Sequence, residues 1–168
     1  MSLARFHTFF LPALIASLII LAATFRLEVT LGLAPCSLCY SQRLMLGLYG
    51  LVCLSAVIHA PGHTGWRGYT WLALACAAGG ATQAARHVWL QGASLQVDAC
   101  AQPVAGLFEY SWSHTFKVLV LGGPDCGSLA WSFLDLTLPE WSLLAFLLLA
   151  ALPLSRLLAH RLRSLHKG

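Results

Sequence analysis

The chain has 168 residues, of which 58% are apolar and only 10% are charged, and its formal net charge is +4. Ordinary soluble domains carry about 25% charged residues. A chain with so few charges cannot cover a surface that faces water. The composition therefore predicts an integral membrane protein, and the length predicts one domain, 1–168. The positive charges form no basic stripe with interleaved aromatic residues, so we expect no nucleic-acid partner.

Four stretches of the chain are apolar enough to be membrane spans: approximately 9–25, 42–60, 67–85 and 141–158. A bilayer core requires about 20 mostly apolar helical residues, with a range of roughly 17 to 25. Backbone groups in lipid must bond within their own segment, so each span should be helical. The expected fold is all-α: an integral membrane four-helix bundle with two outward-facing loops, approximately 26–41 and 86–140.

The first stretch could also be read as a signal peptide, because Arg5 gives it a positive start. Its apolar run, however, exceeds the roughly 7 to 15 residues usual for a signal, and no small-x-small cleavage site follows. We therefore expect an uncleaved membrane span.

The distribution of basic residues predicts the orientation in the membrane. With four spans, both termini share one side, and the short segments on that side are rich in basic residues: Arg5, Arg67, Arg156, Arg161, Arg163 and Lys167. All six acidic residues fall in the two larger loops: Glu28, Asp98, Glu109, Asp125, Asp135 and Glu140. The pattern predicts cytoplasmic termini, with both loops facing outward.

Four of the six cysteines lie in the two outer loops, as two pairs: Cys36 with Cys39, and Cys100 with Cys126. They would share one compartment, which we expect to be the oxidising one. The other two, Cys53 and Cys76, lie inside the second and third spans. A free cysteine there packs as a small apolar side chain.

The first pair, in "CSLCYSQR", has three interpretations: half of a zinc site, a structural bridge or a redox couple. The second pair has 25 intervening residues, which is poor spacing for zinc. A bridge over so short a loop gains little stability. The position before the second span favours a redox couple, because a helix N-terminus stabilises a thiolate.

Arg43 stands four residues after Cys39, so on a helix the two side chains share a face. A fixed positive charge there would stabilise the Cys39 thiolate and could hold an anionic or carbonyl-bearing ligand. The alternative is that Arg43 is an interfacial anchor whose charged end reaches water.

The second loop contains "PVAGLFEYSWSHTF", in which apolar residues recur near helical spacing: Val104, Leu107, Phe108, Trp112 and Phe116. This spacing predicts a short amphipathic helix in the membrane surface; the alternative is a loop with ordinary apolar residues. "GGPDCG" around Cys126 is typical of a turn, so we expect this cysteine on a flexible segment that can reach another sulfur.

Together these features resemble the disulfide bond formation protein B (DsbB) family, membrane quinone reductases that reoxidise a periplasmic thiol oxidase. The resemblance covers the four spans, both loops and both cysteine pairs. The motifs that carry it are "CSLCYSQR", "HVWLQ" and "GGPDCGSLAWSFLDLTLPEW". Gln42 is a departure, because some family members have an acid at that position, and this puts in doubt any role there for a carboxylate.

The resemblance implies a relay of disulfides. Cys100 and Cys126 would form the disulfide presented to a DsbA-like periplasmic protein of thioredoxin fold, whose thiolate attacks Cys100. Electrons would then pass to the pair Cys36 and Cys39, through Cys126 attacking Cys36 or by direct resolution. The sequence alone leaves the resting pairing of these four cysteines open.

The resemblance also implies a quinone as cofactor, either ubiquinone or menaquinone. Cys39 would contact the quinone, Arg43 would orient and polarise its oxygen, and His87 resembles a quinone-proximal histidine. For His87 the alternative is an interfacial polar cap. No metal is expected.

The implied location is the bacterial inner membrane, with several spans, cytoplasmic termini and periplasmic redox loops. One alternative is an enzyme like vitamin K epoxide reductase, but there the Cys-x-x-Cys lies near the outer end of the last span, whereas here it precedes the second. Another is a non-enzymatic membrane assembly factor with structural disulfides.

Overall fold

The computed structural model describes residues 3–32, 36–59, 63–92, 112–122 and 132–165. Its elements in chain order are α1 (Leu3–Leu31), α2 (Ser37–His59), α3 (His63–Gly92), α4 (Trp112–Leu121), β1 (Ser132–Phe133), β2 (Leu136–Thr137) and α5 (Leu138–Leu165). The expected all-α helix bundle is confirmed, and the two short strands form a single antiparallel hairpin.

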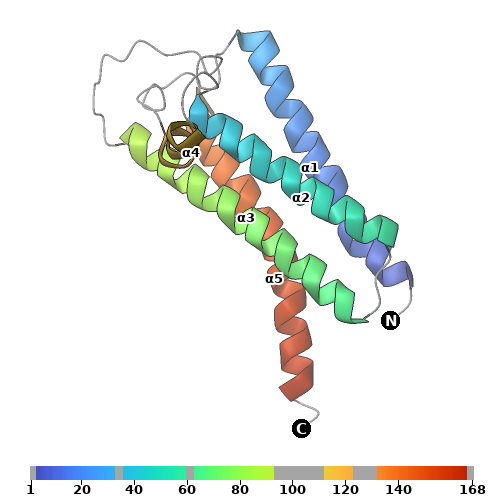
Figure 1. Ribbon diagram of the computed structural model, residues 1–168. Coiled ribbons are helices and arrows are strands. Elements are labelled where there is room, and N and C mark those ends of the chain that lie inside the picture. The colour runs from blue at the N-terminus through green and yellow to red at the C-terminus, as the bar shows by residue number, and fades with distance from the viewer. Residues whose placement is uncertain (1–2, 33–35, 60–62, 93–111, 123–131, 166–168) are drawn as a thin grey trace.

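Four long helices form the body of the molecule (Figure 1). Helix α2 packs against α1 on one side and α3 on the other, and α3 also packs against α5. The short helix α4 packs against α2, at the end of the bundle where α2 begins and α3 ends. The start of α1 and the end of α5 both lie at the opposite end of the bundle, as an even number of long helices requires (Figure 1).

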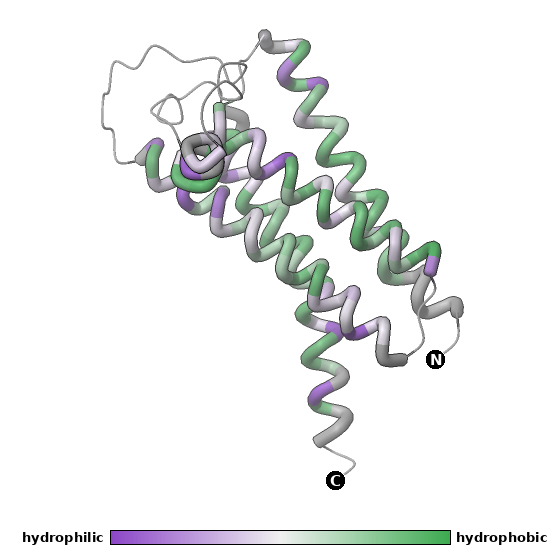
Figure 2. The backbone as a smooth tube through the Cα atoms, in the orientation of Figure 1, coloured by the Kyte–Doolittle hydropathy of each residue, from purple (hydrophilic) through white to green (hydrophobic). Residues whose placement is uncertain are grey.

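Each of the four long helices is longer than the span predicted for it. Within the described residues, three helices are apolar and long enough to cross a membrane: Phe9–Thr30, Ser37–His59 and Leu138–Ala159. Figure 2 shows the apolar residues concentrated along the bodies of the helices. Helix α3 does not reach this apolarity. It is the helix in contact with both α2 and α5, so its polar side chains have protein neighbours.

Small residues let the helices approach closely, as is typical of helix packing in membranes. A Cβ atom added at Gly80 of α3 would lie within 3.0 Å of three ring carbons of Phe146 on α5, so this glycine makes room for the ring. Cys53 is fully buried and Cys76 is partly buried, both against the bundle core. The expectation that Cys53 packs as an apolar side chain is confirmed.

A buried hydrogen bond joins α2 to α5. Proline lacks an N–H, so Pro153 within α5 leaves the carbonyl of Leu149, four residues earlier, without its usual helical donor. The hydroxyl of Tyr49, which is fully buried, donates to that carbonyl oxygen over 3.3 Å. The Leu149 carbonyl thereby gains a hydrogen-bond donor from a neighbouring helix, as a backbone group freed by proline in a membrane helix requires.

Helix α5 begins directly after the hairpin. Leu134 and Asp135 at the hairpin tip both have positive φ, at 55° and 60°, which is the geometry of a tight two-residue turn. The carboxylate of Glu140 accepts hydrogen bonds from both the N–H and the hydroxyl of Thr137, at 2.6 and 2.9 Å. This pairing caps the first turn of α5.

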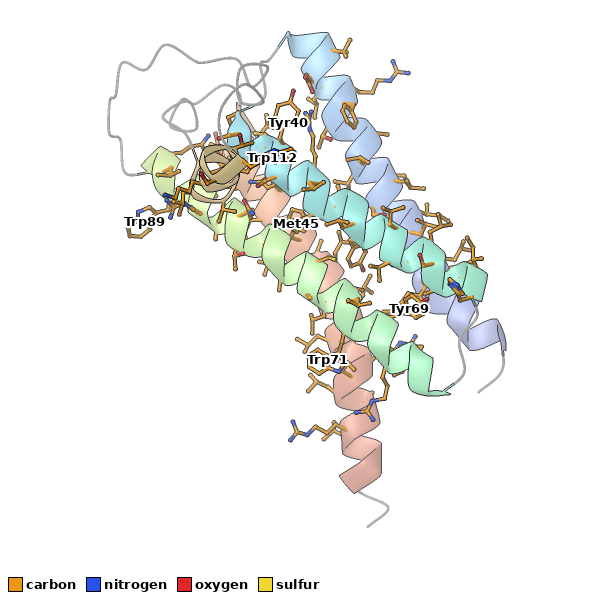
Figure 3. All side chains as sticks on the ribbon, viewed as in Figure 1. Tyr40, Met45, Tyr69, Trp71, Trp89 and Trp112 are labelled. Atoms are coloured by element: carbon orange, nitrogen blue, oxygen red, sulfur yellow. The ribbon has the colours of Figure 1, made fainter. Side chains whose placement is uncertain are left out.

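Large aromatic side chains are exposed toward both ends of the bundle (Figure 3). Trp89 and Trp112 are 76% and 85% exposed near the α4 end, and Trp71 is 58% exposed nearer the other. Exposed tryptophans at such positions are typical of side chains at membrane interfaces.

Candidate functional site

The Cys-x-x-Cys pair lies at the N-terminus of α2. The carbonyl of Cys36 accepts a hydrogen bond from the N–H of Tyr40 over 3.2 Å, so Cys36 sits at the cap of the helix and Cys39 in its first turn. The prediction that both sulfurs lie near a helix N-terminus is confirmed. Both side chains are half-buried thiols, and their Sγ atoms are 3.0 Å apart. A disulfide needs about 2.05 Å, so a small side-chain movement brings the sulfurs to bonding distance once an acceptor takes two electrons and two protons.

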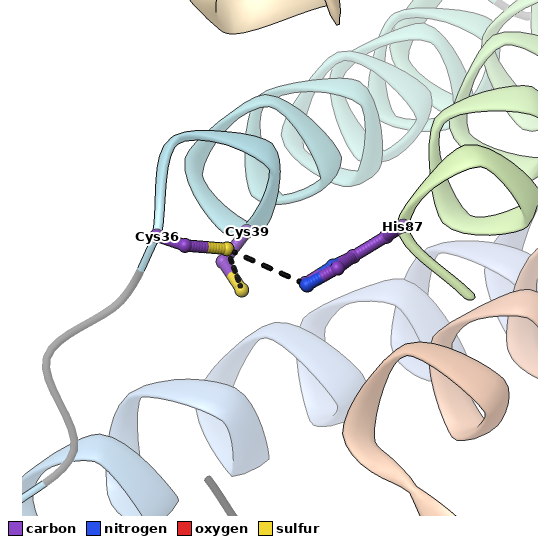
Figure 4. Close-up of side chains that lie close together, drawn as sticks. All are labelled: Cys36, Cys39 and His87. Atoms are coloured by element: carbon purple, nitrogen blue, oxygen red, sulfur yellow. Dashed lines mark hydrogen bonds between the residues drawn. The ribbon is translucent and has the colours of Figure 1, made fainter. Parts of the chain in front are cut away.

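His87 reaches the same place from the last third of α3. Its Nε2 lies 3.6 Å from the Sγ of Cys36, and the side chains of Cys36, Cys39 and His87 converge in the space between α2 and α3 (Figure 4). His87 is only 4% exposed. The sequence predicted it as a site residue, and the structure places it beside the cysteines rather than at the surface. A buried imidazole in contact with a thiol can take up or return the proton of that thiol.

Two further polar residues of α2 fix the position of α3. The Nε2 of buried Gln42 contacts the Nδ1 of His87 over 3.4 Å. The hydroxyl of Ser41 donates to the Oε1 of Gln83, one helical turn before His87. The sequence analysis identified neither contact, because each pair is separated by more than 40 residues. The one available signal was the spacing of Gln83 and His87, four residues apart and therefore on one face of a helix.

Arg43 is directed toward α1. Its guanidinium donates to the carboxylate of Glu28 over 2.5 Å and to the carbonyl of Thr24 over 3.3 Å. It also lies 4.8 Å from the centre of the Phe25 ring and 5.9 Å from that of Tyr40. The structure therefore does not bring Arg43 into the group formed by the two cysteines and the histidine. Arg43 lies one helical turn after Cys39 on α2, and its side chain extends to the C-terminal part of α1.

Helix α4 covers this end of the bundle. The Nε of Arg86 on α3 donates to the carbonyl of Leu121 over 2.7 Å, at the C-terminus of α4. Gly122 follows with φ of +82°, and a Cβ atom there would lie 2.9 Å from a methyl group of Leu38. Only a residue without a side chain can adopt this conformation so close to α2 without strain. The end of α4 is thereby held beside the turn that carries the cysteines.

The predicted amphipathic helix corresponds in part to α4. The structure shows a helix from Trp112 to Leu121, in which Thr115 is buried and Trp112 is exposed. Phe116 also lies within α4, whereas the remaining three residues that suggested the helix, Val104, Leu107 and Phe108, lie outside the described residues. Cys100 and Cys126 also lie outside them.

Two adjacent thiols at a helix end, with a buried imidazole in contact, can exchange protons and close to a disulfide. Among the described residues, helices α1, α2 and α5 are each apolar and long enough to cross a membrane. The fold and the site therefore define a thiol oxidoreductase embedded in a membrane.

The family model for disulfide bond formation protein DsbB matches residues 6–155, and the chain belongs to this family. It is 62% identical over 162 residues to disulfide bond formation protein B 2 of Pseudomonas putida KT2440, covering 96% of each chain. It is 59% identical to the protein of that name from Pseudomonas entomophila L48, covering 97% of each. Disulfide bond formation protein B 1 of Pseudomonas aeruginosa PAO1 is 38% identical, over 87% of this chain and 91% of that one. No solved structure matches the chain significantly.

The family assignment defines the activity. The protein is an oxidoreductase that reoxidises DsbA and passes the electrons to quinone in disulfide bond formation. It is a multi-pass membrane protein. The match supports the resemblance seen in the sequence and does not support either alternative, an enzyme like vitamin K epoxide reductase or a non-enzymatic assembly factor.

Proposed function

We propose that this chain carries electrons through two cysteine pairs, from a periplasmic DsbA-like protein at Cys100 to a quinone at Cys39. The observation that carries the proposal is the convergence of Cys36, Cys39 and His87 at one end of the bundle. These are the three residues at which thiol chemistry and proton transfer would have to meet. The family relationship supports the identity of the partner and of the electron acceptor.

The sulfur steps balance as successive exchanges of disulfides. A thiolate of the partner attacks Cys100, and the bond from Cys100 to Cys126 breaks. The partner's second thiol then resolves the mixed disulfide, and the partner is left oxidised. The released Cys126 attacks Cys36 of the oxidised first pair, and Cys39 leaves as a thiolate that carries the electron pair. Regeneration of both disulfides requires an acceptor of two electrons and two protons.

The residues near Cys39 fit a quinone. A quinone ring is flat and apolar with two carbonyl oxygens, and it would supply the two-electron acceptor when bound. Arg43 provides charged donors and His87 a ring nitrogen that can donate, on either side of the turn that carries Cys39. Glu28 and Thr24 hold the Arg43 guanidinium in a fixed orientation before any ligand binds. These polar residues would contact the two carbonyl oxygens, which ubiquinone and menaquinone share, so they fit either quinone.

We place the redox end of the bundle in the periplasm and both termini in the cytoplasm, in the bacterial inner membrane. The distribution of Lys and Arg supports this orientation. A lipid-soluble acceptor and a water-soluble protein substrate can both reach only a site at the membrane surface. The end of the bundle that carries α4 and the N-terminus of α2 is such a site under this orientation (Figure 1).

The test is anaerobic oxidation of a reduced DsbA-like protein by the purified full-length chain, with ubiquinone or menaquinone as acceptor. We expect turnover with the unmodified chain, none with Cys39→Ala or Cys100→Ala, and retention of a helical, folded protein in both. Cys53→Ala is the matched control, because this buried cysteine lies away from the site, and it should retain turnover.

A second experiment tests the order of the steps. With a partner whose second cysteine is replaced by serine, the thiolate still attacks Cys100 and displaces Cys126, but no second thiol is left to resolve the product. The mixed disulfide should then accumulate on Cys100, which peptide mapping would identify. Trapping on Cys36 instead, or full turnover of the Cys100→Ala variant, would refute the proposed route. Labelling of single-cysteine variants with a membrane-impermeant maleimide tests the orientation, which is wrong if Cys36 is labelled only after the membrane is opened.

A further inference from the structure

We propose that the reduced form of this protein has a specific zinc site formed by Cys36, Cys39 and His87. This goes beyond the electron transfer proposed above, because it assigns a second ligand to the dithiol state. Two thiolates and one imidazole are the protein ligands of a class of zinc sites that keep a fourth position open. Within the described part of the chain, these three residues are the group of metal-ligand side chains that converges closely enough.

The distances fit a single ion. The two Sγ atoms are 3.0 Å apart, Cys36 Sγ is 3.6 Å from His87 Nε2, and all three ligand atoms lie within 4.8 Å of one another. Three ligand atoms at these separations all lie within about 2.4 Å of one point between them. A bound zinc ion lies about 2.3 Å from sulfur and about 2.0–2.1 Å from nitrogen, so an ion at that point would be close to bonding distance from all three atoms. Two thiolates on a tetrahedral ion are about 3.8 Å apart, so the sulfurs must separate by less than about 1 Å. Rotation of one cysteine side chain supplies this.

The electrostatics also favour a divalent cation. Two thiolates and one Zn²⁺ form a neutral group, which a largely buried position between α2 and α3 accommodates better than two separate charges. The nearest fixed positive charge along α2 is Arg43, and its ion pair with Glu28 offsets its repulsion of a cation. Binding releases the two thiol protons, so the reaction is one Zn²⁺ taken up and two protons given to solvent.

Gln42 is placed to orient the third ligand. A histidine that binds a metal through Nε2 carries its proton on Nδ1 and donates it to an outer partner. The side-chain amide of Gln42 already lies 3.4 Å from Nδ1, and a half-turn about its last bond presents Oε1 as the acceptor. Replacement of Gln42 by glutamate would supply a stronger acceptor at the same position.

Occupation of the site prevents disulfide closure, because both thiolates are then metal ligands and cannot bond to each other. Zinc would therefore hold the first cysteine pair reduced, and the oxidised pair would have no site for zinc.

The experiment uses the purified full-length chain with Cys100→Ser and Cys126→Ser, reduced and freed of quinone under anaerobic conditions. Cd²⁺ is the spectroscopic probe, since cadmium thiolates absorb in the ultraviolet, and Zn²⁺ is then added to displace it. We expect one equivalent to bind, with loss of maleimide labelling at Cys36 and Cys39. The same chain oxidised to the disulfide should bind none. Cys76→Ala is the matched control and should bind as its parent does.

Two variants at the histidine complete the test. His87→Ala should lower the affinity more than about 10-fold, since even the loss of an outer partner of a ligand costs that much. His87→Cys restores a ligand, so it should recover binding and increase the cadmium–thiolate absorbance. Equal affinity in His87→Ala, unchanged binding after Cys36→Ser, or no saturable binding by the reduced parent would each overturn the proposal. None of these readouts depends on quinone or on the protein partner, so they stand apart from the proposed electron transfer.

Discussion

The hydrogen bond from Tyr49 to the carbonyl of Leu149 should be a measurable part of the stability of the bundle. The donor is fully buried and the acceptor has lost its helical donor to Pro153, so Tyr49→Phe leaves a buried carbonyl unsatisfied. Such a group costs about 1–3 kcal/mol in soluble proteins. Hydrogen bonds between membrane helices average about 0.6 kcal/mol, with a maximum near 1.7. At 3.3 Å this bond is long, so we expect Tyr49→Phe to lower the free energy of unfolding by about 1 kcal/mol.

A double-mutant cycle with Pro153→Ala tests the cause. An alanine at 153 supplies the N–H that proline lacks, so the Leu149 carbonyl regains a partner within α5. In that background Tyr49→Phe should cost less than about 0.5 kcal/mol. The difference between this cost and the cost of about 1 kcal/mol in the unmodified chain is the coupling energy, and it lies within the range expected for residues that share a partner. Unfolding in mixed micelles with increasing SDS, followed by the helical circular dichroism signal, measures each variant. An equal cost of Tyr49→Phe in both backgrounds would refute the link to the proline.

Two further predictions concern helix contacts. Gly80→Ala should destabilise the bundle by about 1–3 kcal/mol in the same unfolding measurement, because the new Cβ overlaps the ring of Phe146. Gly79→Ala, where the nearest atom lies at 3.4 Å, is the control and should be neutral or slightly stabilising; similar costs for both would contradict the packing argument. Glu28→Gln should cost less than about 1 kcal/mol, because its ion pair with Arg43 is partly exposed to solvent. That cost should shrink further in high salt, and a salt-independent cost would argue against an ion pair.

The sequence was sufficient to predict the four long helices and the position of the first cysteine pair at a helix N-terminus. Long apolar runs have one stable conformation in lipid, so the helical spans follow from composition and length. The thiols at a helix N-terminus follow from the position of "CSLCYSQR" directly before such a run. The ends of the helices were underestimated, because α1 continues to Leu31 and α2 begins at Ser37, beyond the apolar parts that defined the spans.

Contacts between helices were beyond the reach of sequence patterns. The sequence placed Arg43 on the face of Cys39, which is correct as helix geometry, but the side chain extends to Glu28 on α1. That choice depends on how α1 and α2 cross, and no spacing within α2 reports it. Gln42 was considered only as a missing acid, whereas its burial against His87 depends on the packing of α2 and α3.

The hydropathy of α3 gains a physical explanation from these contacts. It is the one long helix in the described residues that falls short of the apolarity of a membrane span, and it is also the helix that packs against both α2 and α5. A polar side chain on a helix that faces lipid has no partner, so polar residues are tolerated where protein covers them. Gln83 and His87 meet this condition, since their partners Ser41 and Gln42 are adjacent on α2. A span of below-average hydropathy in such a chain therefore indicates an interior position in the bundle, and its polar residues indicate where the chemistry takes place.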